Sequence, residues 1–369
     1  KLKSTSGFYK NYVKKFYDEA HLAKAEKRPV AWVASTFPVE TLQAMDIVPV
    51  WPENYASVCA ARRVSVELCE RAEREGFSRD LCSYSRCVLG SMFGYGKQLP
   101  EGGLPGPDFL VAATCACDTH LKWFQVASRI YGVPLFLLDV PYNIGGGDSG
   151  HLDPVHVDYY VSQLGELFAF LERQTGRRMD LDRLSEVLAV SDWTSRLWLE
   201  IQEYRKCVPC PMDARDAFSA VYFMLCVPGS EVAVEFYTRL RDEVRERAKS
   251  GIGVVEDERF RLVWDNLPLW YDLKVFDYLN SLGAVVVAEV FSHTWAGGLD
   301  PARPLESLAH KYLPNMANSS VKRRVDIILN LVKAFKADGL VLPANRGCRM
   351  MSIGETIVRD AVAKELGVP

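Results

Sequence analysis

Five short apolar runs, each rich in Val, Leu or Ala, constrain the fold of this chain more than any other feature. They are "PVAWVAS" (29–35), "DFLVAAT" (108–114), "PLFLLDV" (134–140), "AVVVAEVF" (284–291) and "DGLVLPA" (338–344). Runs of this length without polar alternation are typical of strands buried on both faces of a parallel sheet. Because stretches with helical periodicity separate them, the pattern predicts an α/β fold with open, mostly parallel sheets of the Rossmann or flavodoxin type.

Glycine-rich loops and one long helical stretch divide the chain. A length of 369 residues exceeds what one core usually supports, so two domains are expected. The loops "NIGGGDSG" (143–150) and "GIGVVEDERF" (251–260) mark the boundaries. We predict an N-terminal α/β domain over 1–150, a helical segment over 151–250 and a C-terminal α/β domain over 251–369. The final "AKELGVP" is typical of a helix that leads into a further strand, so we expect the second domain to be incomplete there.

Charge and hydropathy exclude several classes of function. The formal net charge is −3 and there is no dense basic run, so nothing predicts a nucleic-acid partner. No stretch approaches the roughly 18 uninterrupted apolar residues of a membrane span. The first residues, "KLKSTSGFYKNYVKKFYDEAH", have the pattern of an amphipathic helix and not of a signal peptide. We therefore expect a cytoplasmic protein.

Ten cysteines in such a protein require an explanation, because a reducing compartment disfavours disulfides. Cys59, Cys69 and Cys226 lie in apolar, helical-looking patterns, which favours core packing. Cys207 and Cys210 form a C-x-x-C pair in "KCVPCPMDA", where a redox or zinc pair is one interpretation. No second pair completes a tetrahedral zinc site, so two unligated thiols in a turn are the favoured interpretation.

Other cysteines follow apolar runs, where open parallel sheets bind their ligands. Cys115 and Cys117 follow the second run, and Cys348 follows the last. Cys82 and Cys87 lie in "SRDLCSYSRCVLG", a polar loop that opens into a helix. This spacing matches neither zinc knuckles nor the compact ferredoxin motif. Spacing alone therefore leaves ligation of a metal or cluster, catalysis and plain burial open.

Three polar residues share the same placement after apolar runs. Ser35 closes the first run, Glu53 lies in "VPVWPENYA", and His293 lies in "EVFSHTWAGG". A carboxylate among aromatic side chains has a raised pKa and is suited to proton transfer. Capping of a helix that starts at Asn54 is the competing interpretation for Glu53, and a structural role is the competing one for His293.

Six segments together resemble the 2-hydroxyacyl-CoA dehydratase family, which also contains the class I benzoyl-CoA reductase subunits. They are "RPVAWVASTFPVETLQAMDI", "WPENYASVCAARRVSVELCERAEREGFSRDLCSYSR", "PDFLVAATCACDTHLKWFQ", "LPLWYDL", "HTWAGG" and "NRGCRMMSIGE". The likeness runs from about residue 25 to the end and keeps the order of the segments. It is strongest to the larger, active-site subunit of the two-subunit dehydratases.

The resemblance implies an oxygen-sensitive [4Fe-4S] cluster. Its three cysteine ligands fall on Cys82 in "LCSYSR", Cys117 in "CACDTHLKWF" and Cys348 in "NRGCRMMS". Three thiolates leave one iron without a protein thiolate, and in this family the thioester carbonyl of the substrate is thought to bind there. Cys115 competes with Cys117 for one ligand position, and Cys117 is favoured.

The family's active-site serine falls on Ser35 and its glutamate on Glu53, while His293 matches a histidine of the family's "HAW"-like segment. The implied enzyme is a radical (R)-2-hydroxyacyl-CoA dehydratase, a hydro-lyase. One electron on the thioester carbonyl gives a ketyl radical anion that expels the hydroxyl group, and a 2-enoyl-CoA leaves. The acyl group itself stays open.

The resemblance also implies partners. They are the acyl-CoA substrate, a smaller homologous subunit, and a separate ATP-hydrolysing iron–sulfur activator that supplies the electron. Two alternatives remain at this point. One is a subunit of a benzoyl-CoA reductase-type enzyme, and the other is a non-catalytic iron–sulfur subunit that relays electrons.

Overall fold

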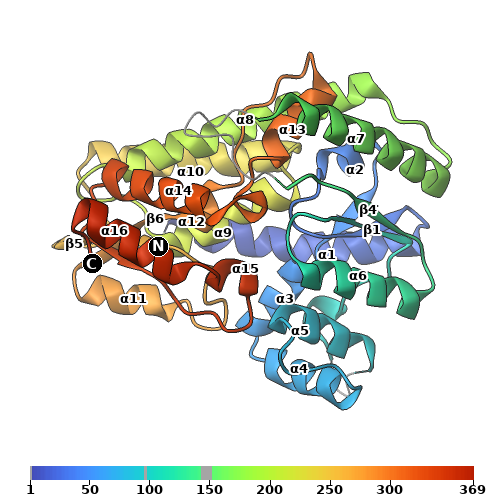
Figure 1. Ribbon diagram of the computed structural model, residues 1–369, viewed down its shortest axis with the longest axis horizontal. Coiled ribbons are helices and arrows are strands. Elements are labelled where there is room, and N and C mark those ends of the chain that lie inside the picture. The colour runs from blue at the N-terminus through green and yellow to red at the C-terminus, as the bar shows by residue number, and fades with distance from the viewer. Residues whose placement is uncertain (1, 95–97, 143–151) are drawn as a thin grey trace.

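The computed structural model describes residues 2–94, 98–142 and 152–369, and within them the strands form two parallel sheets (Figure 1). The first sheet has the order β2-β1-β3-β4 and the second the order β6-β5-β7. The strands are β1 (Val30–Val33), β2 (Val48–Val50), β3 (Phe109–Ala113), β4 (Leu135–Leu138), β5 (Phe260–Trp264), β6 (Ala284–Glu289) and β7 (Gly339–Val341). The predicted α/β class with parallel sheets is confirmed, and each of the five apolar runs contains a strand.

Helices cover both sheets and fill the stretch between them (Figure 1). They are α1 (Tyr9–Ala25), α2 (Glu40–Ala44), α3 (Pro52–Ala61), α4 (Ser65–Arg74), α5 (Ser83–Met92), α6 (Asp118–Tyr131), α7 (Pro154–Thr175), α8 (Leu181–Arg205), α9 (Ala214–Cys226), α10 (Glu231–Lys249), α11 (Lys274–Ser281), α12 (Val290–His293), α13 (Pro304–Tyr312), α14 (Val321–Ala334), α15 (Arg349–Ser352) and α16 (Glu355–Leu366). Within the described ranges, no helix combines the length and the apolar character that crossing a membrane requires.

The predicted helical segment contains α7 to α10, whereas its predicted start in the loop 143–150 lies outside the described residues. The domain boundaries themselves stay predictions. At the other end of the chain, the amide of Leu340 in β7 donates a hydrogen bond of 2.9 Å to the carbonyl of Pro369. The last residues therefore lie beside the edge of the second sheet.

The two central strands of the first sheet are buried on both faces, as their uninterrupted apolar sequences require. Every residue of β1 and β3 is buried. Trp32 in β1 aligns with Val50 on one side and with Leu110 on the other. Since all three pairings in this sheet are parallel, the carboxyl ends of its strands meet at one edge, where ligands bind in open α/β sheets.

Two buried ion pairs join segments that lie far apart in the sequence. Arg205, the last residue of α8, bonds to Glu289 at the end of β6 with an Nη1–Oε2 distance of 3.0 Å, and both side chains are fully buried. Glu40 in α2 accepts from Lys311 at 2.6 Å and from the hydroxyl of Tyr312 at 2.7 Å. Burial raises the pKa of Glu40, but the charge and hydrogen bond of Lys311 outweigh it and hold that pKa below its usual value. Removing one member of such a pair would leave an uncompensated buried charge.

The N-terminal residues are anchored to α9 through Asp216. The hydroxyl of Thr5 donates a short hydrogen bond to this carboxyl, and the amide of Leu2 donates one of 3.5 Å. Burial and then the charge of Asp213 raise the pKa of Asp216 to about 6. A carboxyl whose pKa is higher in the folded than in the unfolded chain stabilises the fold at low pH, and this contribution is lost as the pH rises through 6.

The Asp216→Asn variant should therefore gain stability relative to wild type as the pH rises. Between pH 4.5 and pH 7 its free energy of unfolding, relative to wild type, should increase by about 2 kcal/mol. Urea unfolding of both proteins at the two pH values measures this change. A difference between the proteins that is the same at both pH values would contradict the assigned pKa.

Candidate active site

Loops that follow the strands build one cavity of about 140 Å³. Ser35 and Thr36 follow β1, and Glu53 stands in the first turn of α3, which follows β2. Cys117 lies between β3 and α6, and Cys348 lies between β7 and α15. All five line the cavity, so the strand-end rule brings together residues from both sheets.

The three cysteines predicted as ligands share one local geometry. Cys82, Cys117 and Cys348 are the residues immediately before α5, α6 and α15, and each lines the cavity. Burial raises the pKa of all three thiols, that of Cys117 to about 12, and backbone amides of the following helical turn act in the opposite direction. The three thiols also affect one another through charge. Cys82 and Cys348 raise the pKa of Cys117, and Cys82 raises the pKa of Cys348.

The thiols converge on the cavity without converging on one point. Across the ranges that the structure describes, no three His, Cys, Asp or Glu side chains are arranged to hold a single metal ion. In a [4Fe-4S] cube each cysteine binds a different iron, so its ligands surround the cube and do not meet at a common atom. Three thiols on three loops around one cavity are a donor set whose chemistry suits such a cube.

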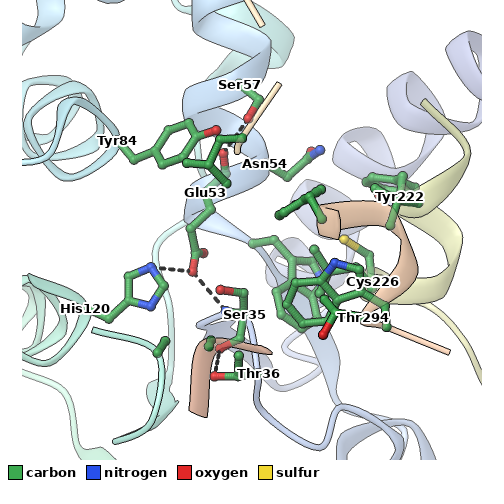
Figure 2. Close-up of a pocket in the computed structure, with 18 of the residues that line it drawn as sticks. Ser35, Thr36, Glu53, Asn54, Ser57, Tyr84, His120, Tyr222, Cys226 and Thr294 are labelled. Atoms are coloured by element: carbon green, nitrogen blue, oxygen red, sulfur yellow. Dashed lines mark hydrogen bonds and ion pairs between the residues drawn. The ribbon is translucent and has the colours of Figure 1, made fainter. Parts of the chain in front are cut away.

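Glu53 is held by two neighbours on the polar side of the cavity (Figure 2). Its Oε1 accepts from the backbone amide of Ser35 at 2.9 Å and lies 3.1 Å from Nε2 of His120. Its Oε2 and Nδ1 of His120 are buried and have no hydrogen-bond partner in the described part of the chain. The pair therefore offers one free acceptor and one free ring nitrogen to a bound molecule.

The alternative role of Glu53 as a helix cap is wrong. Helix α3 begins at Pro52, one residue before Glu53, and the capping residue is Trp51, whose side chain makes no capping bond. Glu53 thus lies inside the first turn, where the helix dipole favours a negative charge. Its side chain reaches across to Ser35, away from the amides of its own helix.

The turn at Ser35 and Thr36 is strained. Thr36 has a φ of 70°, which is rare for a β-branched residue, and its hydroxyl donates a short hydrogen bond to the carbonyl of Ser35. Such strained positions occur mainly at active sites and ligand clamps. Here the turn directs the amide of Ser35 at Glu53.

The structure does not bring His293 to these residues. Its neighbours Phe291 and Thr294 line the cavity, but His293 itself does not. Burial and then the charge of Arg205 lower the pKa of His293. The catalytic role predicted for it has no support in this geometry, and a structural role fits better.

His120 was not among the residues predicted from the sequence. It lies three positions after Cys117, in the first turn of α6. The available signal was the histidine in "CACDTHLKWF", within a segment that already carried a predicted ligand. Its contact with Glu53 depends on two elements far apart in sequence, so no local pattern indicates it.

The remaining cysteines fall outside the polar side of the cavity. Cys115 does not line the cavity, and burial raises its pKa to about 11 while the Thr36 side chain acts in the opposite direction. Cys207 is exposed, whereas Cys210 is buried and bonds to the carbonyl of Met212. Cys226 is buried, as expected, and its side chain also lines the cavity opposite Glu53 (Figure 2).

A wider groove of about 1100 Å³ adjoins the cavity. Cys82, Tyr84, Trp270 and Cys348 line both spaces. The groove is more open and more polar, with several arginines along it. Cys82 and Cys348 can therefore be reached from the groove as well as from the enclosed cavity.

Comparison with known proteins finds similarity along most of the chain. The family model described as "2-hydroxyglutaryl-CoA dehydratase, D-component" matches residues 34–369. The chain is 29% identical over 359 residues to the (R)-2-hydroxyisocaproyl-CoA dehydratase alpha subunit of Clostridioides difficile, covering 96% of this chain and 86% of that protein. It is 28% identical to the (R)-phenyllactyl-CoA dehydratase alpha subunit of Clostridium sporogenes, covering 94% and 84%. It is 32% identical to a benzoyl-CoA reductase subunit of Thauera aromatica, covering 89% and 79%.

Proposed function

Because the chain belongs to the 2-hydroxyglutaryl-CoA dehydratase D-component family, we propose that it is the catalytic subunit of a radical (R)-2-hydroxyacyl-CoA dehydratase. The reaction removes the hydroxyl group from C2 and a proton from C3, which yields a 2-enoyl-CoA and water. The observation that carries the proposal is the meeting of Cys82, Cys117 and Cys348 with Glu53 on one cavity. Both dehydratase relatives above are alpha subunits, and on that basis we also propose a partner subunit. The smaller size of that partner and an ATP-dependent iron–sulfur activator are further parts of the proposal, which rest on the family resemblance.

The three cysteines would hold a [4Fe-4S] cluster as thiolates. When bound, the cluster would supply one electron to the thioester carbonyl, which makes the ketyl radical anion that can expel the hydroxyl group, and would recover the electron at the end. The raised pKa values of the free thiols mean that the protein alone does not favour three negative charges here. A cationic metal centre would compensate them.

The residues around Glu53 would orient the substrate. The Oε2 atom of Glu53, which has no partner among the described residues, would accept a hydrogen bond from the hydroxyl group that leaves C2. The amide of Ser35 and Nε2 of His120 fix the other carboxylate oxygen, so the carboxylate has little freedom to rotate. The Ser35 hydroxyl lines the same space and would donate to the substrate carbonyl, where negative charge develops.

His120 should act as a positioning residue for Glu53. Replacing it by alanine removes one hydrogen bond to a charged group, which is worth about 1.5–3 kcal/mol. We expect kcat of the assembled enzyme to fall roughly 10- to 100-fold in His120→Ala, with KM nearly unchanged. His120→Gln, whose amide nitrogen can reach the position of Nε2, should recover part of kcat.

His310→Ala is a matched control, because His310 is exposed at the end of α13. Anaerobic steady-state kinetics of all three variants would provide the test. Equal losses in His120→Ala and His120→Gln would contradict the positioning role, because packing alone would then explain them. The iron content of each variant shows whether the cluster is retained.

A benzoyl-CoA reductase-type subunit is the second candidate, and one observation favours it. The identity to the benzoyl-CoA reductase subunit, 32%, is higher than the 24–29% found for the dehydratase alpha subunits. In that case the same entry of electrons would reduce an aromatic ring. Supplying the anaerobic, assembled enzyme with electrons and with 2-hydroxyacyl-CoA or aryl-CoA thioesters separates the two. Formation of a 2-enoyl-CoA supports the dehydratase, and a ring-reduced thioester as the sole product would overturn it.

An electron-relay subunit without its own chemistry would be a different class of protein. The polar pair of Glu53 and His120 beside the thiols argues against it, because a relay needs no free acceptor in an enclosed cavity. Binding of an acyl-CoA should change the electron paramagnetic resonance spectrum of this subunit's own cluster. An unchanged spectrum at saturating acyl-CoA would favour the relay, and an iron-free protein after anaerobic purification would contradict both.

A further inference from the structure

The cavity has an apolar side that faces Glu53, and one face of α9 forms part of it. The residues Phe218, Val221, Tyr222, Leu225 and Cys226, which we call the α9 wall, all line the cavity. They are spaced three and four positions apart, so they form one stripe along the helix. Figure 2 shows Tyr222 and Cys226 of this wall across the cavity from Glu53 and His120.

Aromatic side chains from other elements extend the α9 wall. Trp270, Phe291 and Trp295 line the same side, and the ring centroids of Phe218 and Phe291 are 6.2 Å apart. The hydroxyl of Tyr222 and the indole Nε1 of Trp295 are buried on this side and have no partner among the residues that the structure describes. Burial raises the pKa of Tyr222 well above its usual value, so this hydroxyl stays neutral.

No cation is available to a charged acyl chain on this side. The described residues that line the cavity include neither lysine nor arginine, and their one carboxylate is Glu53. Lys311 borders a small neighbouring cavity that shares Leu225 and Trp295, but its ammonium group is already bonded to Glu40 at 2.6 Å. A second carboxylate on the substrate would therefore be buried without a counter-charge, which is costly.

The charge of Glu53 adds to this cost. Burial raises the pKa of the Cys226 thiol well above its usual value, and the negative charge of Glu53 raises it further. The electrostatic potential at Cys226 thus disfavours anions at the α9 wall.

We propose that the α9 wall binds the acyl chain of the substrate, and that this chain is uncharged and apolar, either a branched aliphatic chain or a single aromatic ring. The proposal rests on the proposed function, because it assumes that an acyl-CoA enters this cavity. It excludes dicarboxylic acyl groups such as the one in the name of the family. Specificity would follow from desolvation. Burial of an apolar chain in this cavity is favourable, whereas burial of an unpaired carboxylate costs free energy.

Calorimetric titration of the assembled enzyme under anaerobic conditions tests the proposal without turnover. The probes are 4-methylpentanoyl-CoA, 3-phenylpropanoyl-CoA and glutaryl-CoA, which lack the 2-hydroxyl group and share the same CoA moiety. We expect the first two to bind about tenfold or more tightly than glutaryl-CoA. Equal or tighter binding of glutaryl-CoA would overturn the proposal and leave the proposed function standing. If no acyl-CoA binds more tightly than CoA itself, the proposed function fails as well.

A matched pair of variants tests the role of the α9 wall. Val221→Thr replaces a methyl group on the wall by a hydroxyl group, and Val244→Thr makes the same change at a buried site on α10 that does not line the cavity. The first should weaken binding of both apolar thioesters about fourfold, which corresponds to the loss of one buried methyl group, and should leave glutaryl-CoA unaffected. The second should change none of the three affinities. Equal weakening of all three thioesters in Val221→Thr, or none, would contradict contact between the wall and the acyl chain.

Discussion

Replacing Cys348 by serine should remove the iron–sulfur cluster from this subunit. Cys348, Cys82 and Cys117 line one cavity, and each would bind one iron of the proposed cube, so the loss of one thiolate would leave only two. We expect iron and sulfide in the anaerobically purified subunit to fall from about four per chain to nearly none. Chemical iron and sulfide analysis, together with the absorbance of the cluster in the visible range, measures the change.

Two cysteines that lie away from the cavity serve as controls for this experiment. Cys207→Ser changes an exposed thiol, and Cys115→Ser changes the thiol two residues from Cys117. Both variants should keep their iron, whereas Cys117→Ser should lose it. A Cys348→Ser protein with its full iron content would show that the cysteines of the cavity are not the ligands. The comparison of Cys115 with Cys117 also decides which of the two binds the cluster.

Changing Glu53 to glutamine should reduce turnover far more than binding. The amide oxygen of glutamine can still accept from the amide of Ser35, but the side chain loses the charge and the proton affinity of the carboxylate. Proton transfer and orientation by a positioned side chain contribute typically about 10²- to 10⁴-fold, so we expect kcat to fall by that factor. The affinity for a 2-hydroxyacyl-CoA should change much less.

Rapid-quench measurement of single turnovers separates this chemical step from substrate binding. Glu166→Gln, an exposed position on α7, is the control and should have wild-type kinetics. Unchanged turnover in Glu53→Gln with the cluster retained would refute the role of the carboxylate. A lower iron content in Glu53→Gln would instead indicate that the residue supports the cluster, which contradicts the same assignment.

Local patterns predicted much of the fold because buried parallel strands leave a local signal. The two strands that were missed, β2 and β5, each contain a residue that interrupts the apolar run. Pro49 is tolerated in β2 because this strand lies at the edge of its sheet. Arg261 is tolerated in β5 because its buried guanidinium pairs with Glu258 and bonds to the carbonyl of Phe335. Such compensation comes from tertiary contacts, which a sequence window does not contain.

The candidate site was predictable to the extent that each residue follows a strand. Ser35, Glu53, Cys117 and Cys348 became candidates in this way, and the resemblance to a family selected Cys82, which lies in a polar loop. His120 was missed and His293 was misplaced for the same reason. Both depend on which side chain lies opposite, namely Glu53 in one case and Arg205 in the other.

The wide separation of the three cysteines has a consequence for biosynthesis. Cys82 and Cys117 are made early, while Cys348 follows more than 200 residues later. At about 5–20 residues per second, a growing chain would carry two ligands without the third for about 10 to 50 s. An incomplete pair of thiols in a nascent chain is open to oxidation and to the wrong metal. Under the proposed ligation, insertion of the cluster must wait until the second sheet has been synthesised.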